Sequence, residues 1–160
     1  MHKSVYLLAA LCLPLGQAQA QTPQQTVQLL YGTGSVAASG QSASLLYSAT
    51  DNARTTGLGI RVHFNSAQVH IAAIENLLPE ASLGVQVLPD ADDLDQDPAT
   101  DQYIMAAWAD LLGAWPATQT GQVELFTIAY DTLPGLEQTA FTLTDSAVAV
   151  GFEFVARQGD

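Results

Sequence analysis

The sequence predicts an all-β protein, a single antiparallel β-sandwich, and three observations support this. Residues 57–64 alternate apolar side chains with glycine or polar ones, as a strand with one buried and one solvated face does. Residues 148–154 repeat that alternation near the C-terminus. Turn-forming residues such as Asp51-Asn52 and Pro134-Gly135 separate the apolar runs at short intervals. Many short strands between such turns indicate a sandwich rather than alternating strands and helices.

These patterns predict eight strands in chain order. The expected ranges are 27–31, 45–48, 57–64, 69–74, 85–88, 123–130, 141–144 and 148–154. Each is rich in β-branched, aromatic or leucine side chains and is bounded by glycine, proline, asparagine or serine. We expect residues 69–74 to pair with residues 57–64, because a turn at Asn65-Ser66 connects them.

The segment 103–115 has the pattern of a helix instead. Its apolar side chains recur at intervals of three and four residues, which places them on one side of a helix. Thr100 or Asp101 is suited to cap its start and Gly113 to end it. Periodicity alone therefore predicts an amphipathic helix here.

Residues 1–20 read as a secretory signal peptide, with Lys3 in a positive start, an apolar stretch, and Ala18-Gln19-Ala20 as the cleavage site. The apolar stretch is too short to cross a bilayer, so we expect no membrane insertion. Residues 21–160 then form one domain, large enough for a hydrophobic core. The prediction is a secreted protein, periplasmic or extracellular, with no cysteine left for a disulfide.

The charge balance excludes some partners. After signal removal, three arginines face sixteen acidic residues. Nucleic-acid binding depends on lysine and arginine that neutralise phosphates, so no nucleic-acid partner is expected. Anionic membrane surfaces are disfavoured for the same reason. Neutral polymers and cations remain as partners, and solubility in a salty exterior is the alternative explanation of the acidity.

Three stretches resemble the cohesin-like and carbohydrate-binding-module-like β-sandwiches of secreted bacterial proteins. Residues 56–69 resemble a strand, corner and following strand, with Asn65-Ser66 at the corner. Residues 121–130 resemble a later strand that begins with Leu-Phe and then alternates, and residues 140–149 resemble the closing hairpin. The resemblance implies a nine-strand jelly-roll sandwich that displays a binding surface. It also implies a strand over residues 103–109, which we prefer to the helix.

An enzyme is not expected. The chain has no G-x-S-x-G motif, no phosphate-binding loop and, after signal removal, no cysteine or lysine nucleophile. A pair of carboxylates is enough for glycoside hydrolysis, but clustered aspartates in one loop are better ligands than an acid and a base.

A run of aspartates between Pro89 and Asp101 predicts a calcium site. Asp93, Asp95, Asp97 and Asp101 occupy positions 1, 3, 5 and 9 of a calcium-loop pattern, although Pro98 and Ile104 depart from a full EF-hand. The remaining ligands are expected from Asp90, Asp92 or a distant acid such as Asp110. Clustered carboxylates repel one another, so an ordered loop needs a counter-charge. The alternative is a solvated acidic loop without an ion.

Aromatic residues offer a second candidate site. Trp115, Trp108 and Tyr103, together with Tyr130, have the amphipathic rings on which sugars stack. Trp115 is the better candidate, because Gly113 and Pro116 place it in a loop, whereas Trp108 lies in an apolar run and is expected to be buried. Core packing is the alternative for all four.

His63 and His70 occupy outward positions of the strands 57–64 and 69–74, where they are expected to face each other across a hairpin. A transition-metal site would need a third ligand, and polar filling of an exposed surface is the preferred interpretation.

Two functions follow from these observations. The first is a secreted, calcium-stabilised binding module for carbohydrate or a cell-surface protein. The alternative is a structural or assembly protein that makes protein–protein contacts through sheet faces or edges.

Overall fold

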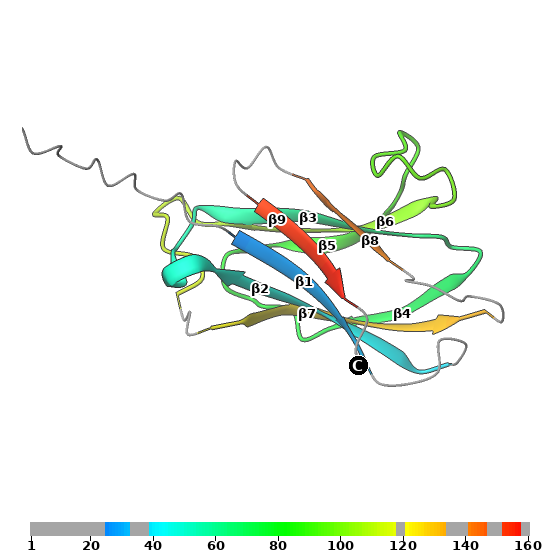
Figure 1. The fold of residues 1–160 in the computed structure, drawn as a ribbon, viewed down its shortest axis with the longest axis horizontal. Coiled ribbons are helices and arrows are strands. Elements are labelled where there is room, and N and C mark those ends of the chain that lie inside the picture. Colours follow the sequence, from blue (N-terminus) through cyan, green and yellow to red (C-terminus); the bar gives the residue numbers. More distant parts are fainter. Residues whose placement is uncertain (1–24, 33–38, 118–120, 134–140, 147–151, 158–160) are drawn as a thin grey trace, which may run out of the picture.

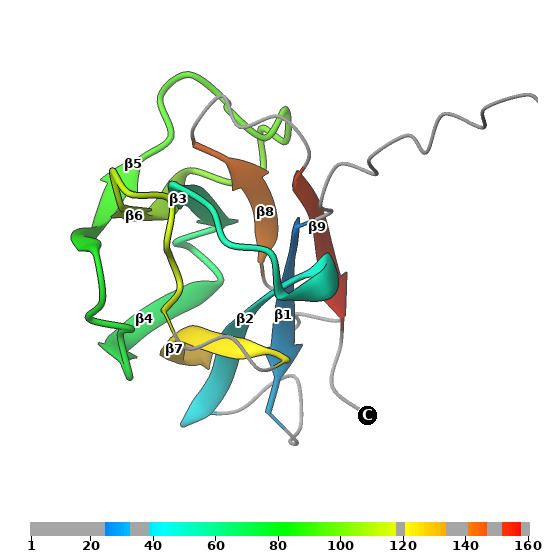
Figure 2. The same cartoon turned by 90° about the vertical axis from the view of Figure 1, so that its left-hand side faces the viewer.

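The computed structural model describes residues 25–32, 39–117, 121–133, 141–146 and 152–157, which form two packed β-sheets (Figures 1 and 2). One sheet has the strand order β4-β7-β2-β1-β9 and the other β5-β6-β3-β8. The strands are β1 (Gln25–Tyr31), β2 (Gln41–Ala49), β3 (Gly57–Phe64), β4 (Val69–Glu75), β5 (Ser82–Pro89), β6 (Gln102–Ala109), β7 (Val123–Thr132), β8 (Thr142–Asp145) and β9 (Phe152–Arg157). The all-β sandwich predicted from the sequence is confirmed.

Strand pairing differs from the prediction in two places. β3 and β4 follow each other in the chain but belong to different sheets, because β3 pairs with β6 and β8 while β4 pairs with β7. The turn after Phe64 therefore carries the chain from one layer to the other. The second difference is β9, which runs parallel to β1, whereas the other strand pairs are antiparallel. Residues 148–151 of the last predicted strand lie outside the described residues.

The segment with helical periodicity is a strand, as the resemblance implied. β6 pairs with β3 on one side and β5 on the other, so its backbone groups are satisfied by the sheet. Its inward side chains, Ile104, Ala106 and Trp108, are buried between the layers. The apolar residues that completed the helical pattern, Leu111 and Leu112, lie beyond the strand and are exposed. Tertiary packing thus overrides the local periodicity.

Large aromatic side chains fill the space between the sheets. Trp115 packs against Tyr47, with ring centroids 5.0 Å apart, and against Trp108 at 5.9 Å. Trp108 also stacks on Phe126 at 6.4 Å. Both indoles donate hydrogen bonds to backbone carbonyls, Trp108 to Leu78 and Trp115 to Glu80. Because each indole N–H keeps a hydrogen-bond partner, the two rings can be buried in the core without an unsatisfied polar group.

The burial of the tryptophans corrects the predicted sugar platform. Trp115 is 0% exposed and Trp108 2%, so neither presents a ring face to a ligand. Trp115 does lie outside the named strands, but it forms a backbone bridge with Thr55 that places its side chain inside the sandwich. The expectation of an exposed Trp115 is therefore wrong. Tyr103, the third predicted residue, is half-buried.

Gly57 opens β3 at a point where the chain approaches β6 closely. Its φ of +138° is one that side-chain-bearing residues rarely adopt, and a Cβ there would lie 2.1 Å from the carbonyl oxygen of Trp108. Glycine therefore allows β3 to meet β6 in register. That register sets which residues of β3 face outward.

Within the described ranges the only helix is the three-residue 3₁₀ turn Thr50–Asn52, so no helix there could cross a membrane. The predicted signal peptide, residues 1–20, lies outside those ranges.

Candidate functional site

The aspartate run forms the loop between β5 and β6, at the opposite end of the sandwich from residues 110–117 (Figure 1). Its base is closed because the N–H of Asp90 donates to the carbonyl of Asp101 at 2.8 Å, and Asp101 N–H donates to Phe64 at 3.2 Å. Asp93 and Gln96 adopt φ values of 51° and 59°, which turn the chain back on itself. The loop is therefore folded onto the sheet.

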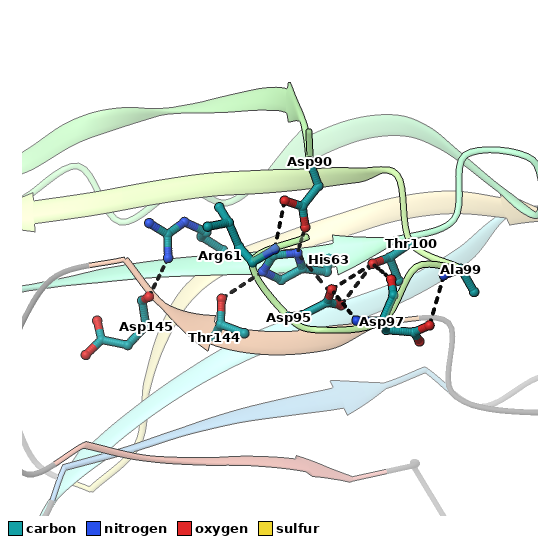
Figure 3. Close-up of polar contacts among 10 residues, drawn as sticks. Arg61, His63, Asp90, Asp95, Asp97, Ala99, Thr100, Thr144 and Asp145 are labelled. Carbon is teal, nitrogen blue, oxygen red and sulfur yellow. Dashed lines mark hydrogen bonds and ion pairs between the residues drawn. The ribbon is translucent and has the colours of Figure 1, made fainter. Parts of the chain in front are cut away.

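His63 lies at the centre of the contact between this loop and the sheet (Figure 3). It points outward from β3, yet its side chain is 0% exposed. Nδ1 lies 2.8 Å from Oδ2 of Asp90, and Nε2 lies 2.7 Å from Oγ1 of Thr144 on β8. The imidazole thus connects the start of the loop with two strands.

A second carboxylate completes the cluster. Oδ2 of Asp95 lies 3.8 Å from Nδ1 of His63, and the Asp95 side chain is also 0% exposed. One ligand atom from each of His63, Asp90 and Asp95 lies within 4.8 Å of the other two. We call these three residues the His63 cluster. Nδ1 and two carboxylate oxygens therefore converge on one buried point.

Further hydrogen bonds hold the two carboxylates in place. Oδ1 of Asp90 accepts from the N–H of Leu94 at 3.0 Å. The hydroxyl of Thr100 contacts both carboxylate oxygens of Asp95, at 2.9 and 3.0 Å, and the N–H of Asp97 donates to Asp95 at 3.2 Å. The carboxylates are thus fixed by groups outside the cluster as well as by His63.

Arg61 and Tyr103 border the cluster. The Tyr103 ring centroid lies 5.4 Å from that of His63, and the Arg61 guanidinium carbon lies 5.8 Å from the same Tyr103 ring. Arg61 donates to the backbone carbonyl of Asp145. Among the described residues, no arginine forms an ion pair with Asp90 or Asp95. The cluster therefore gains no positive charge from arginine.

Thr144, His63 and Asp90 are connected in the order hydroxyl, imidazole, carboxylate, which also occurs in hydrolytic triads. A triad needs an imidazole that meets a bound substrate, and the His63 side chain has no exposed surface. We therefore assign this relay an anchoring role for the loop.

The structure gathers only part of the predicted calcium set. Asp90 and Asp95 come together, but Asp93, Asp97 and Asp101 do not join them, and among the described residues the His63 cluster is the single group of three that meets metal-ligand spacing. The Asp97 carboxylate accepts from Ala99 N–H at 2.9 Å. The exposed Asp92 likewise contributes no ligand to the cluster. Calcium binding by the aspartate run stays a prediction.

Asp101 has a local structural role at the base of the loop. Its carboxylate accepts from the Ser66 hydroxyl at 2.6 Å and the Ser66 N–H at 2.7 Å. These two hydrogen bonds hold the pKa of Asp101 below its usual value of 3.8.

We expect Asp101→Asn to lower the urea midpoint slightly at pH 7, and the difference from wild type to shrink as the pH falls below 3.8. A depressed folded-state pKa stabilises the protein above the unfolded pKa, and that stability is lost as the carboxylate is protonated. Urea unfolding between pH 7 and pH 2.5 measures this, with Asp92→Asn as a charge-matched control in the same run. A difference that persisted unchanged at pH 2.5 would contradict the role of the ionised carboxylate.

The histidine prediction needs correction. His63 is buried rather than exposed, and His70 lies on β4 in the other sheet with 78% of its side chain exposed. The two do not face each other, because β3 and β4 are not paired. Alternation placed His63 correctly on the outer face of its sheet but gave no sign that the loop covers it. No sequence pattern indicated that Thr100 would contact Asp95 or that Thr144 would contact His63.

Two sheets packed face to face, with a loop folded over the outer face of one, define a β-sandwich. A chain in the crystal structure of a type I cohesin–dockerin complex from Clostridium thermocellum is similar, with a TM-score of 0.47 and 10% sequence identity. The match covers 87% of this chain and 94% of that chain. No family model matches the sequence. No curated protein matches it either.

Proposed function

We propose that the protein is a secreted, non-catalytic binding module that takes an extended, positively charged segment of a protein partner along strand β5. The observation that carries this is the edge position of β5 in the order β5-β6-β3-β8, with Leu83 71% and Val87 46% exposed. An edge strand offers unpaired backbone groups with which an added strand can pair. Secretion is proposed from the signal-like N-terminus.

The apolar surface near β5 extends beyond the strand itself. Leu111 and Leu112 are 99% and 89% exposed in the turn that follows β6. The Asp110 carboxylate holds this turn by accepting from the N–H groups of Leu112 and Ala114. Ala109 N–H donates to Ala81, which connects the turn to the start of β5. Exposed leucines in a well-held turn are typical of a contact surface.

The negative charge of this chain indicates that the partner segment is positively charged. β5 ends at Pro89, where the aspartate run begins, so the surroundings of its two ends differ. The exposed Leu83 lies near the start, on the side of the turn with Leu111 and Leu112, and the aspartates follow the finish. The whole chain has a formal net charge of −12. A segment with apolar residues at one end and lysine or arginine at the other would complement both, and opposite charge speeds association. The same charge disfavours pairing between two copies of this chain.

Carbohydrate is the weaker candidate after the fold is known. Sugar stacking needs an exposed ring face, and the two tryptophans are in the core. Tyr103 is half-buried and has Arg61 over its ring. Protein binding through a sheet edge, the alternative set out from the sequence, is therefore the function we propose.

Site-specific photo-crosslinking tests this proposal. A photoreactive amino acid at Leu83 should give an adduct with a second protein in the organism that makes this chain. The same probe at Leu30, which is 43% exposed on β1 of the other sheet, should not. Mass spectrometry should place the crosslink in a basic, extended segment of the partner.

A charge reversal provides the second arm. Val87→Lys should reduce the Leu83 adduct at least tenfold, because a lysine on an edge blocks strand addition and repels a basic segment. Leu133→Lys, at a position 57% exposed, is the matched control and should leave the adduct unchanged. Equal adducts from positions 83 and 30, an adduct between two copies of this chain, or no adduct would overturn the proposal.

A further inference from the structure

We propose that the His63 cluster binds a first-row divalent transition-metal ion, of which zinc is the probe, through Nδ1 of His63 and one carboxylate oxygen each of Asp90 and Asp95. This inference concerns a different place from the β5 edge and does not rest on the proposed partner. It also differs from the calcium loop predicted from the sequence, because it uses a histidine and only two members of the aspartate run.

The first argument is charge. Asp90 and Asp95 place two carboxylates against one imidazole, and all three side chains are 0% exposed. Among the described residues, no arginine forms an ion pair with either carboxylate. Buried charges are costly unless they are paired or coordinate a metal. A divalent cation neutralises both carboxylates at once.

The second argument is geometry. Two ligands of a tetrahedral zinc ion lie about 3.4 Å apart, since each zinc–ligand bond measures about 2.1 Å. The Nδ1–oxygen distances here are 2.8 Å for Asp90 and 3.8 Å for Asp95, which lie on either side of that value. Each of these two distances differs from the tetrahedral value by about half an ångström. The oxygens of Asp90 and Asp95 lie within 4.8 Å of each other, so small side-chain movements would bring the three ligands around one ion.

The third argument is the support around the ligands. Metal-binding histidines use their second ring nitrogen for a hydrogen bond that fixes the tautomer. Nε2 of His63 has such a partner in Thr144 at 2.7 Å. The two carboxylates are oriented in the same way, Asp90 by Leu94 N–H and Asp95 by the Thr100 hydroxyl. The Thr100 hydroxyl also lies 3.0 Å from Oδ2 of Asp95, so it supports the same oxygen that faces His63.

The donor set selects the metal. An imidazole nitrogen with two carboxylates suits zinc, iron or manganese, whereas calcium takes six to eight oxygen ligands. The buried cluster offers one nitrogen and few oxygens. We therefore expect zinc to bind and calcium to bind far more weakly at this point.

Calorimetric titration of the chelator-treated protein tests the inference. Zinc should bind with a 1:1 stoichiometry and raise the melting temperature by several degrees, since binding to the folded state alone stabilises it. Calcium and magnesium at the same concentration should change it by less than a tenth as much. X-ray absorption of the zinc-loaded protein should show one nitrogen ligand from imidazole.

Variants identify the ligands. Asp95→Asn is the main one, because Asp95 lies 3.8 Å from the ring and its loss spares the short His63–Asp90 contact, so this variant is expected to fold. It should weaken zinc binding at least tenfold, as should His63→Gln. The matched controls His70→Gln and Asp97→Asn should bind zinc like wild type.

Three results would overturn the inference. The first is the absence of zinc binding, and the second is zinc binding that Asp95→Asn leaves unchanged. The third is calcium binding that is as tight as that of zinc and that His63→Gln does not weaken. The last result would assign an all-oxygen site to the loop. None of them bears on photo-crosslinking at Leu83, so the two proposals can fail independently.

Discussion

Trp115→Ala is expected to lower the free energy of unfolding by about 3–5 kcal/mol, as truncation of a buried tryptophan does. Trp115 is 0% exposed and contacts both Tyr47 and Trp108. The variant also leaves the carbonyl of Glu80 without its indole donor. Urea unfolding followed by circular dichroism measures the loss.

Two variants control for this result. Trp115→Phe keeps an aromatic ring and should lose about half as much, because a smaller cavity remains. Leu112→Ala, in the same loop but 89% exposed, should change stability by less than about 0.5 kcal/mol. If Trp115→Ala unfolded at the wild-type midpoint, Trp115 would not belong to the core, and a ligand-binding role would be open again.

Asp90→Ala is expected to cost about 3 kcal/mol in metal-free buffer, because it leaves a buried imidazole nitrogen and a partly buried N–H group without their acceptor. The lost partners are Nδ1 of His63 and the N–H of Leu94. The damage should be local at first, so amide hydrogen exchange at Leu94 should accelerate while β2 stays protected. Chemical unfolding with a chelator present gives the total.

Asp92, two residues further along the loop, provides the comparison for Asp90. Asp92→Ala removes the same charge from an exposed position and should change stability by less than about 0.5 kcal/mol. Thr144→Val removes one hydrogen bond from His63 and should cost about 1 kcal/mol. Coinciding midpoints for the Asp90 and Asp92 variants would show that the loop does not depend on the His63 contact.

Alternation was the most reliable guide to the strands. Residues 57–64 coincide with β3, and residues 69–74 and 123–130 fall within β4 and β7. It failed to predict partners, because the side-chain pattern of a strand tells which face is buried but not which strand lies beside it. The turn at Asn65-Ser66 was therefore predicted as a hairpin, although it connects two sheets.

Periodicity was misleading for residues 103–115, because buried residues of a strand and exposed residues of the following turn were treated as one apolar pattern. Ile104 and Trp108 are core residues of a strand, whereas Leu111 and Leu112 belong to an exposed turn. Over these residues the spacing of apolar side chains is compatible with a helix and with a strand. Only pairing with β3 and β5 decides between them.

The site was predicted in part. The aspartate run lies in the loop that contributes Asp90 and Asp95 to the His63 cluster, and both were among the predicted calcium ligands. Metal binding itself stays a prediction. Spacing alone could not show that hydroxyl groups of Ser66 and Thr100 hydrogen-bond to the carboxylates of Asp101 and Asp95. His63 was assigned to the solvated face because no sequence pattern reveals that a loop beginning 27 residues later folds over it.

The parallel pairing of β1 with β9 places the first and last described strands side by side. During synthesis, residue 25 emerges long before residue 152, so β1 has to wait for its neighbour until all the strands between them have been made. A ribosome that stalled before β9 would release a sheet ending in a bare strand, open to aggregation. Nascent chains cut before residue 152 should therefore depend on chaperones more than chains that contain β9.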